Sequence, residues 1–183
     1  MTTKARATID DLYRVPDNAK AEIVNGEVVL MSPTGSRPGR ASFNIASSLR
    51  GHELPGKPGY AFGDNVGFAV NLPNRDSFSP DAAWYIGNID SMKFLEGAPT
   101  FAAEVRSEND YGPTAEREIA EKRADYFAAG TLVVWDVDLL SEEIIKVYRS
   151  SDPDNPTVYG RGEIAEAEPA VPGWRFPVDE LFR

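Results

Sequence analysis

Two acidic residues stand out because each lies in an apolar run typical of a buried strand. Asp81 follows Ser79-Pro80 and leads into Ala82 to Ile86, and Glu104 lies in the run from Thr100 to Val105. A buried carboxylate is costly unless a cation or hydrogen bonds compensate its charge. If these two strands pair antiparallel, the start of one lies beside the end of the other. We therefore expect Asp81 and Glu104 to meet at one edge of a sheet.

Two carboxylates brought this close favour a divalent metal ion between them, because like charges otherwise repel and raise one pKa. Oxygen ligands suit Mg²⁺ or Mn²⁺, and such an ion can polarise a phosphoryl oxygen and activate water. The alternative is purely structural. Asp81 would then cap a turn after Pro80, and Glu104 would pair with Arg106 or Arg123.

A lysine lies within the apolar stripe of the clearest predicted helix, residues 114–129. The residues that share this stripe at helical spacing are Ala115, Ile119, Lys122, Tyr126 and Ala129. The stripe predicts that Lys122 points towards the strand of Glu104, where it could hold a water molecule or stabilise developing negative charge. The alternatives are an exposed Glu118–Lys122 pair, or Arg123 in the same role.

Glu22 is the third candidate acid, and it belongs to a predicted hairpin over residues 21–31. Asn25-Gly26 is a strong turn signal between two apolar runs. Alternation places Glu22 and Val24 on one face and Ile23 on the other. Glu22 could bind the same metal ion or a second one, or it could be an edge-strand acid that discourages aggregation.

Composition limits the class of protein. The chain has 183 residues, 42 % of them hydrophobic, a net charge of −10, no cysteine and a single histidine, His52. These counts exclude disulfides and thiolate metal sites and make a multi-histidine site unlikely to form. No apolar run is long enough to span a membrane, and residues 1–6 lead into no apolar signal segment, so we expect a cytoplasmic protein.

The charge is unevenly distributed along the chain. Net negative charge argues against nucleic-acid binding through bulk electrostatics. Residues 31–63 nevertheless carry four cations against one acid: Arg37, Arg40, Arg50 and Lys57 against Glu53. This segment is either a solvated loop with scattered cations or a local surface that faces an anionic substrate.

The pattern of elements predicts one mixed α/β or α+β domain over residues 1–183. Helices are expected at the start (from Thr8, ending by Pro16), over 42–49 and over 114–129. Strands are expected at 21–31 (the hairpin), 60–72, 81–86, 100–105, 132–137 and 144–148. Residues 87–99 should be loop with a short helix at most, and residues 152–156 a turn. From residue 157 onward we expect short strands and turns, ending in a helical turn over residues 178–182. We expect the three tryptophans in the core, His52 at the surface, and Asp136 and Asp138 at the end of a buried strand, where they start a turn.

Seven segments in this order resemble the Uma-two family of putative restriction-endonuclease-like proteins, over nearly the whole chain. They are Ala21 to Val29, Met31-Ser32-Pro33, Ser79-Pro80-Asp81, Ala103 to Ser107, Glu121 to Gly130, Val134 to Asp138, and Pro172 to Val178.

The resemblance implies the PD-(D/E)XK nuclease fold, a central mixed sheet flanked by helices with a metal site at one sheet edge. It implies that Glu22, Asp81 and Glu104 form the acidic cluster. In that superfamily a lysine commonly lies two residues after the second acid, where this chain has Arg106. In this family the lysine is thought to lie on the following helix, which matches Lys122.

The implied activity is Mg²⁺- or Mn²⁺-dependent cleavage of DNA, with Asp81 and Glu104 as metal ligands, Glu22 as a further ligand or water-orienting acid, and Lys122 as the catalytic cation. The net charge, and the absence of a histidine that relatives often carry near Ser42, also fit an inactive interaction module or homodimer. Hydrolysis of a smaller phosphoester is a third reading.

Overall fold

The computed structural model describes residues 5–16 and 19–183. Residues 1–4 and 17–18 lie outside this description. The expectation for residues 1–6, that they lead into no signal segment, falls partly on these residues. The helices are α1 (Ile9–Leu12), α2 (Ser36–His52), α3 (Pro113–Ala128) and a closing 3₁₀ helix, η2 (Val178–Phe182). No described helix is long and apolar enough to cross a membrane.

A mixed six-stranded sheet forms the centre of the protein, with the strand order β11-β10-β9-β8-β6-β3. These strands are β3 (Tyr60–Phe62), β6 (Ala82–Tyr85), β8 (Phe101–Val105), β9 (Val133–Val137), β10 (Ile145–Arg149) and β11 (Asp152–Tyr159). Only β8 and β9 are parallel; the other neighbours are antiparallel. Parallel neighbours need a long crossover connection, and α3 provides it.

Three small sheets surround the central one. The first is the hairpin of β1 (Ala21–Val24) and β2 (Glu27–Leu30). The second joins β4 (Phe68–Ala69), β5 (Ser77–Phe78) and β7 (Leu95–Glu96), and the third joins β12 (Ile164–Glu166) and β13 (Arg175–Pro177). Asn25 and Gly26 both have positive φ, 52° and 76°, as the predicted two-residue turn requires.

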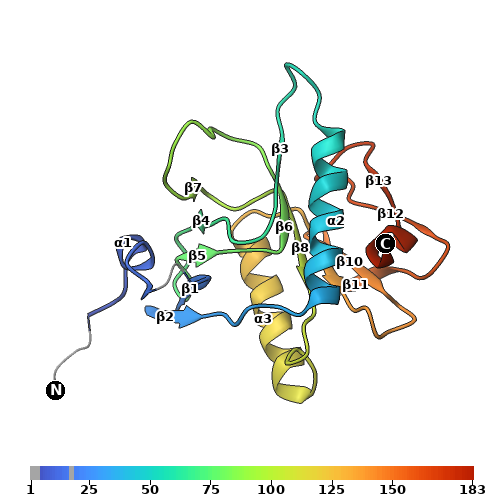
Figure 1. Cartoon of the computed structure of the whole chain (residues 1–183). Helices are drawn as coiled ribbons and strands as arrows, with labels where there is room; N and C mark the ends of the chain where they lie inside the picture. Colours follow the sequence, from blue (N-terminus) through green and yellow to red (C-terminus); the bar gives the residue numbers. More distant parts are fainter. Residues whose placement is uncertain (1–4, 17–18) are drawn as a thin grey trace.

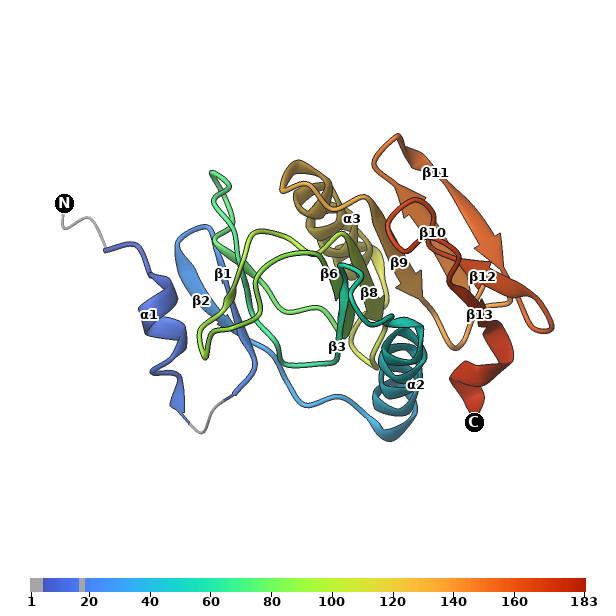
Figure 2. The ribbon, with the colours of Figure 1, turned by 90° about the horizontal axis from the view of Figure 1, so that it is seen from above.

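Alternating side chains divide the core between the two faces of the central sheet. Trp84, Phe101 and Trp135 point to the face covered by α2 and the C-terminal segment, where Trp174 stacks on Trp135. Ala83, Ala102 and Val134 point to the other face, where they pack near Phe78 of β5 and Tyr126 of α3. Figures 1 and 2 show α2 and α3 on opposite sides of β6 and β8. The predicted mixed fold and the burial of all three tryptophans are confirmed.

Three of the predicted boundaries are wrong. Residues 152–156 belong to strand β11, which lies at the sheet edge and pairs only with β10. Proline has no N–H to donate, but the outer side of an edge strand has no neighbouring strand to receive one, so Pro153 and Pro156 are tolerated there. Helix α2 begins at Ser36 rather than residue 42, and Pro38 falls in its first turn, where a missing N–H is harmless. The 87–99 segment contains strand β7 and no helix.

Candidate functional site

Asp81 and Glu104 lie side by side at one edge of the central sheet, as the antiparallel pairing predicts. The backbone N–H of Asp81 donates to the carbonyl of Ala103 (3.1 Å), and the N–H of Val105 donates to Oδ2 of Asp81 (2.8 Å). Helix α2 fixes the same point, because Ser42 Oγ donates to the Asp81 carbonyl at 2.7 Å. Asp81 and Glu104 keep 19 % and 26 % of their side chains exposed.

Lys122 points from α3 to these acids, as the apolar stripe predicts. Its Nζ lies 3.0 Å from Oε1 of Glu22 and 2.9 Å from Oε1 of Glu104. The alternative of a solvent-exposed pair with Glu118 is therefore wrong. Burial alone would lower the pKa of Lys122, but the two carboxylates outweigh that effect and raise it, so the ammonium is charged at neutral pH.

Glu22 is almost fully buried and contacts three polar partners, Arg75, Ser79 and Lys122. Its Oε2 accepts from Arg75 Nη1 at 2.6 Å, and its Oε1 accepts from the Ser79 N–H at 2.8 Å in addition to facing Lys122. Burial would raise the pKa of Glu22, but Lys122 and Arg75 lower it further than burial raises it. Arg75 is itself held by Asp125 of α3, 2.8 Å from its Nε.

The hairpin that carries Glu22 is fixed to the rest of the molecule by its backbone. The Ile23 N–H donates to Ser77 Oγ at 2.9 Å, and the Asp76 N–H donates to the Ile23 carbonyl at 3.1 Å. The N–H of Asn25 donates to the Asn74 carbonyl at 2.7 Å. These bonds place the first hairpin strand beside β5 and aim Glu22 at α3.

Two further residues join the site that the sequence reasoning did not assign to it. Lys20 places its Nζ 2.9 Å from Oδ1 of Asp81 and 2.6 Å from Oδ1 of Asp64. Tyr126 donates its hydroxyl to Oε1 of Glu104 at 2.6 Å. Tyr126 shares the helix stripe of Lys122 at a spacing of four, and this signal was readable in the sequence. Lys20 lies one residue before β1, outside the predicted hairpin, and carried no such signal.

The electrostatics of Glu104 differ from those of Glu22. Burial raises the pKa of Glu104, and the nearby carboxylates of Asp81 and Glu22 raise it further, against the opposing pull of Lys122 and Lys20. The pKa of Tyr126 is also raised, chiefly by burial and by the charge of Glu104, so its hydroxyl remains a donor. A cation added beside Glu104 would therefore favour the charged form of this carboxyl group.

The alternatives for Arg106 and Arg123 are wrong. Arg106 donates to Asp136 Oδ1 and Oδ2, both at 2.7 Å, and also pairs with Glu116. Asp136 is buried inside β9, as the predicted strand places it, and it is Asp138 that accepts the Leu140 N–H in the turn that follows. Arg123 lies over the ring of Tyr148, 3.7 Å from its centre. Neither arginine contacts Glu104 within the described part of the chain.

The fit of a metal ion differs among the three acids. Among the described residues, no group of three or more acidic or histidine side chains is arranged to hold an ion. Both carboxylate oxygens of Glu22 already have partners: Oε2 contacts Arg75, and Oε1 contacts Ser79 and Lys122. Asp81 and Glu104 fit better, because both are partly exposed and both contacts of Glu104 fall on Oε1, leaving Oε2 without a partner in the described structure.

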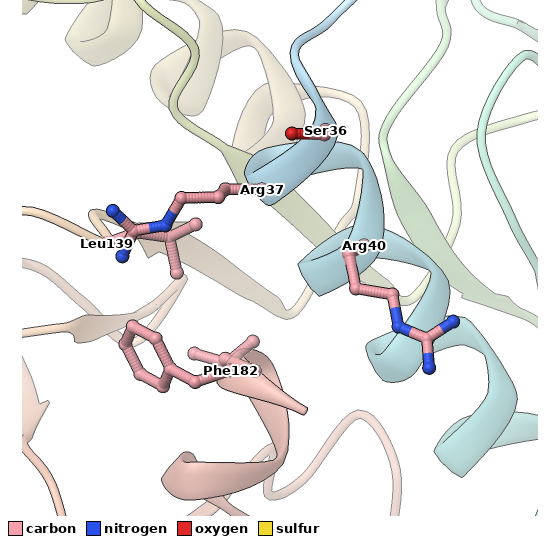
Figure 3. Close-up of a pocket in the computed structure, with 6 residues that line it drawn as sticks. Ser36, Arg37, Arg40, Leu139 and Phe182 are labelled. Atoms are coloured by element: carbon pink, nitrogen blue, oxygen red, sulfur yellow. The ribbon is translucent and has the colours of Figure 1, made fainter.

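A pocket of about 470 Å³ lies on the other side of the sheet, at the edge where β8 and β9 end. Its lining residues are Ser36, Arg37, Arg40, Leu139, Leu181 and Phe182. Figure 3 shows the Arg37 side chain extending from the first turn of α2 to Leu139, while Arg40 points away from it. Two of the four cations noted in residues 31–63 therefore lie in the first turns of α2, at the pocket that also includes Leu139 and Phe182.

The fold is shared with a solved crystal structure. The match is a crystal structure from Anabaena variabilis described as a putative nuclease belonging to DUF820, with a TM-score of 0.73 and 17 % sequence identity. It covers 96 % of this chain and 97 % of that chain, so the likeness extends over the whole fold.

The chain belongs to the Uma2 (Uma-two) family, whose description is "Putative restriction endonuclease" and whose model matches residues 8–179. This confirms the family that the sequence motifs resemble. A comparison with curated proteins found no match.

Proposed function

We propose that this protein is a divalent-metal-dependent phosphodiesterase that cleaves DNA. The observation that carries the proposal is the position of Lys122 Nζ, which lies within 3.0 Å of Glu22 and Glu104 next to Asp81. The three acids and the lysine come from four separate segments, yet they meet at one sheet edge. Membership of a nuclease family supports the same reaction class.

Asp81 and Glu104 are the proposed metal ligands, with Mg²⁺ or Mn²⁺ as the ion. When bound, such an ion polarises a phosphoryl oxygen and lowers the pKa of a water molecule. Tyr126 holds Oε1 of Glu104, so that Oε2 has no partner in the described structure, and the Val105 N–H holds Oδ2 of Asp81. Both carboxylates are thus oriented before any ligand arrives.

Lys122 is the proposed catalytic cation. Its charge is secured by two carboxylates, so it can position the attacking water or stabilise negative charge on the phosphoryl oxygens. Glu22 is a positioning residue for Lys122, because it is buried and is itself held by Arg75. Arg37 and Arg40, in the first turns of α2, are the proposed source of positive charge for the DNA backbone.

The test uses supercoiled plasmid with purified protein and Mn²⁺ or Mg²⁺. Asp81→Asn and Lys122→Met should each reduce cleavage by at least about a hundredfold, the usual size for one electrostatic catalytic group. Asp90→Asn is the matched control, because Asp90 is an exposed loop acid. Cleavage by Asp81→Asn at the wild-type rate would refute the assignment.

The same experiment separates the competing functions. Hydrolysis of a small phosphodiester such as bis(p-nitrophenyl) phosphate, with plasmid left intact, would indicate a smaller substrate. No hydrolysis of either substrate and no binding of Mn²⁺ at millimolar concentration would indicate an interaction module. The homodimer, the single domain and the cytoplasmic location stay predictions from the sequence.

A further inference from the structure

Lys20 occupies the coordination space of the proposed metal site, and its contacts lead to an inference that rests on the proposed function. The Lys20 ammonium lies 2.9 Å from Oδ1 of Asp81, the oxygen that the Val105 N–H does not use. It also lies 2.6 Å from Asp64, which follows β3 and is 44 % exposed. One cation is therefore shared between a site acid and an acid at the surface.

The backbone of Lys20 cannot move far, because its carbonyl accepts the Met31 N–H at 2.8 Å where the hairpin closes. Asp64 is equally well placed, since its Oδ1 also accepts the Asn65 N–H at 2.7 Å. The freedom that remains is in the four-carbon side chain of Lys20, which can rotate while its base stays fixed. A short swing takes the ammonium away from Asp81 and leaves it on Asp64.

The charges of the cluster favour such a swing. Glu22, Asp81 and Glu104 carry three negative charges and face two lysines, while Arg75 is matched by Asp125. A divalent ion bound to Asp81 would lie beside the Lys20 ammonium, and the two cations would repel each other in a partly buried place. If Lys20 withdraws to Asp64, the ion, Lys122 and the three carboxylates balance.

We propose that Lys20 is a displaceable cation that holds Asp81 in the metal-free protein and moves to Asp64 when the metal binds. It keeps the repelling carboxylates together without a metal, and it competes with the metal for Oδ1 of Asp81. The identity of the metal does not alter this competition, because any divalent cation meets the same ammonium.

The test is a titration of the full-length protein with Mn²⁺, followed by isothermal calorimetry. Lys20→Met removes the competitor and should tighten Mn²⁺ binding by about tenfold, which is the effect of removing one partly screened neighbouring charge. Asp64→Asn removes the alternative partner and should weaken Mn²⁺ binding by several-fold. Lys57→Met is the control, because Lys57 is an exposed lysine and its loss changes the net charge equally.

A second measurement does not depend on affinity. Lys20→Met should lower the melting temperature of the metal-free protein, and added Mn²⁺ should raise it by more than in the wild type. Asp64→Asn lies at the surface and keeps the proposal testable if Lys20→Met folds poorly.

Unchanged or weaker Mn²⁺ binding by Lys20→Met would overturn this inference while leaving the proposed function intact, provided that Asp81→Asn abolishes binding. Absence of Mn²⁺ binding by both the wild type and Lys20→Met would overturn the inference and the metal-dependent function together. Wild-type binding that Asp81→Asn leaves unchanged would refute the site itself.

Discussion

Replacing Glu22 by glutamine should be among the most destabilising single changes in this protein. The Glu22 side chain is 2 % exposed and lies between Arg75 and Lys122, whose side chains are 7 % and 17 % exposed. The substitution keeps the shape but leaves two cations facing a neutral amide. Removing one partner of a buried pair costs about 3–5 kcal/mol. For a chain of this size, that loss lowers the melting temperature by roughly 10 °C.

The free energy of unfolding is measured by urea titration, followed through tryptophan fluorescence, since Trp135 and Trp174 are buried. Glu118→Gln is the control; Glu118 is an exposed acid on α3, so its loss should cost at most about 0.5 kcal/mol. The double variant Glu22→Gln, Lys122→Met should recover part of the loss because it removes one unpaired cation. A cost below about 1 kcal/mol for Glu22→Gln would refute the reasoning.

The same variant has a predicted pH dependence. The folded-state pKa of Glu22 lies below its ordinary value of 4.5, so the folded protein binds fewer protons there than the unfolded chain. Its stabilising effect is therefore complete above that ordinary value and is lost as the pH falls through the folded-state pKa. The difference in unfolding free energy between wild type and Glu22→Gln should shrink on acidification below about pH 4.5. A difference that widens there would contradict the sign.

Three further predictions concern the site and the arginines of α2. Because the pKa of Glu104 is raised, its charged form costs stability at neutral pH, so Glu104→Gln should raise the melting temperature of the metal-free protein; a decrease in calorimetry would contradict this. Tyr126→Phe removes the donor to Glu104 and should cost about 1 kcal/mol in unfolding free energy and weaken Mn²⁺ binding several-fold, as a calorimetric titration can measure. The pair Arg37→Ala, Arg40→Ala should reduce the salt dependence of DNA binding by a slope of about 2, read by fluorescence anisotropy in the Asp81→Asn background; an unchanged slope would exclude these arginines.

The sequence predicts the parts of this site that follow from local periodicity. The apolar runs identify the strands of Asp81 and Glu104, and the helical stripe identifies the direction of Lys122. The Asn25-Gly26 turn fixes the face on which Glu22 lies. In each case a regular repeat relates the residue to neighbours close in the sequence.

The partners that complete the site do not follow from such repeats. Arg75 meets Glu22 across 53 residues, and Lys20 meets Asp81 across 61 residues. Each lies in a short connecting segment without helical or strand periodicity, so only the tertiary fold brings it to its acid. The strand at residues 152–159 was missed for a similar reason, because its prolines are tolerated only at the outer edge of a finished sheet.

The parallel pairing of β8 and β9 links the assembly of the sheet to the assembly of the site. These two strands can join only through a crossover, and α3, which carries Lys122, is that crossover. A folding chain therefore cannot complete its central sheet without also bringing the lysine over the acids. During synthesis, Glu22 and Arg75 leave the ribosome well before α3. Lys122 can therefore reach Glu22 only after α3 has also been made.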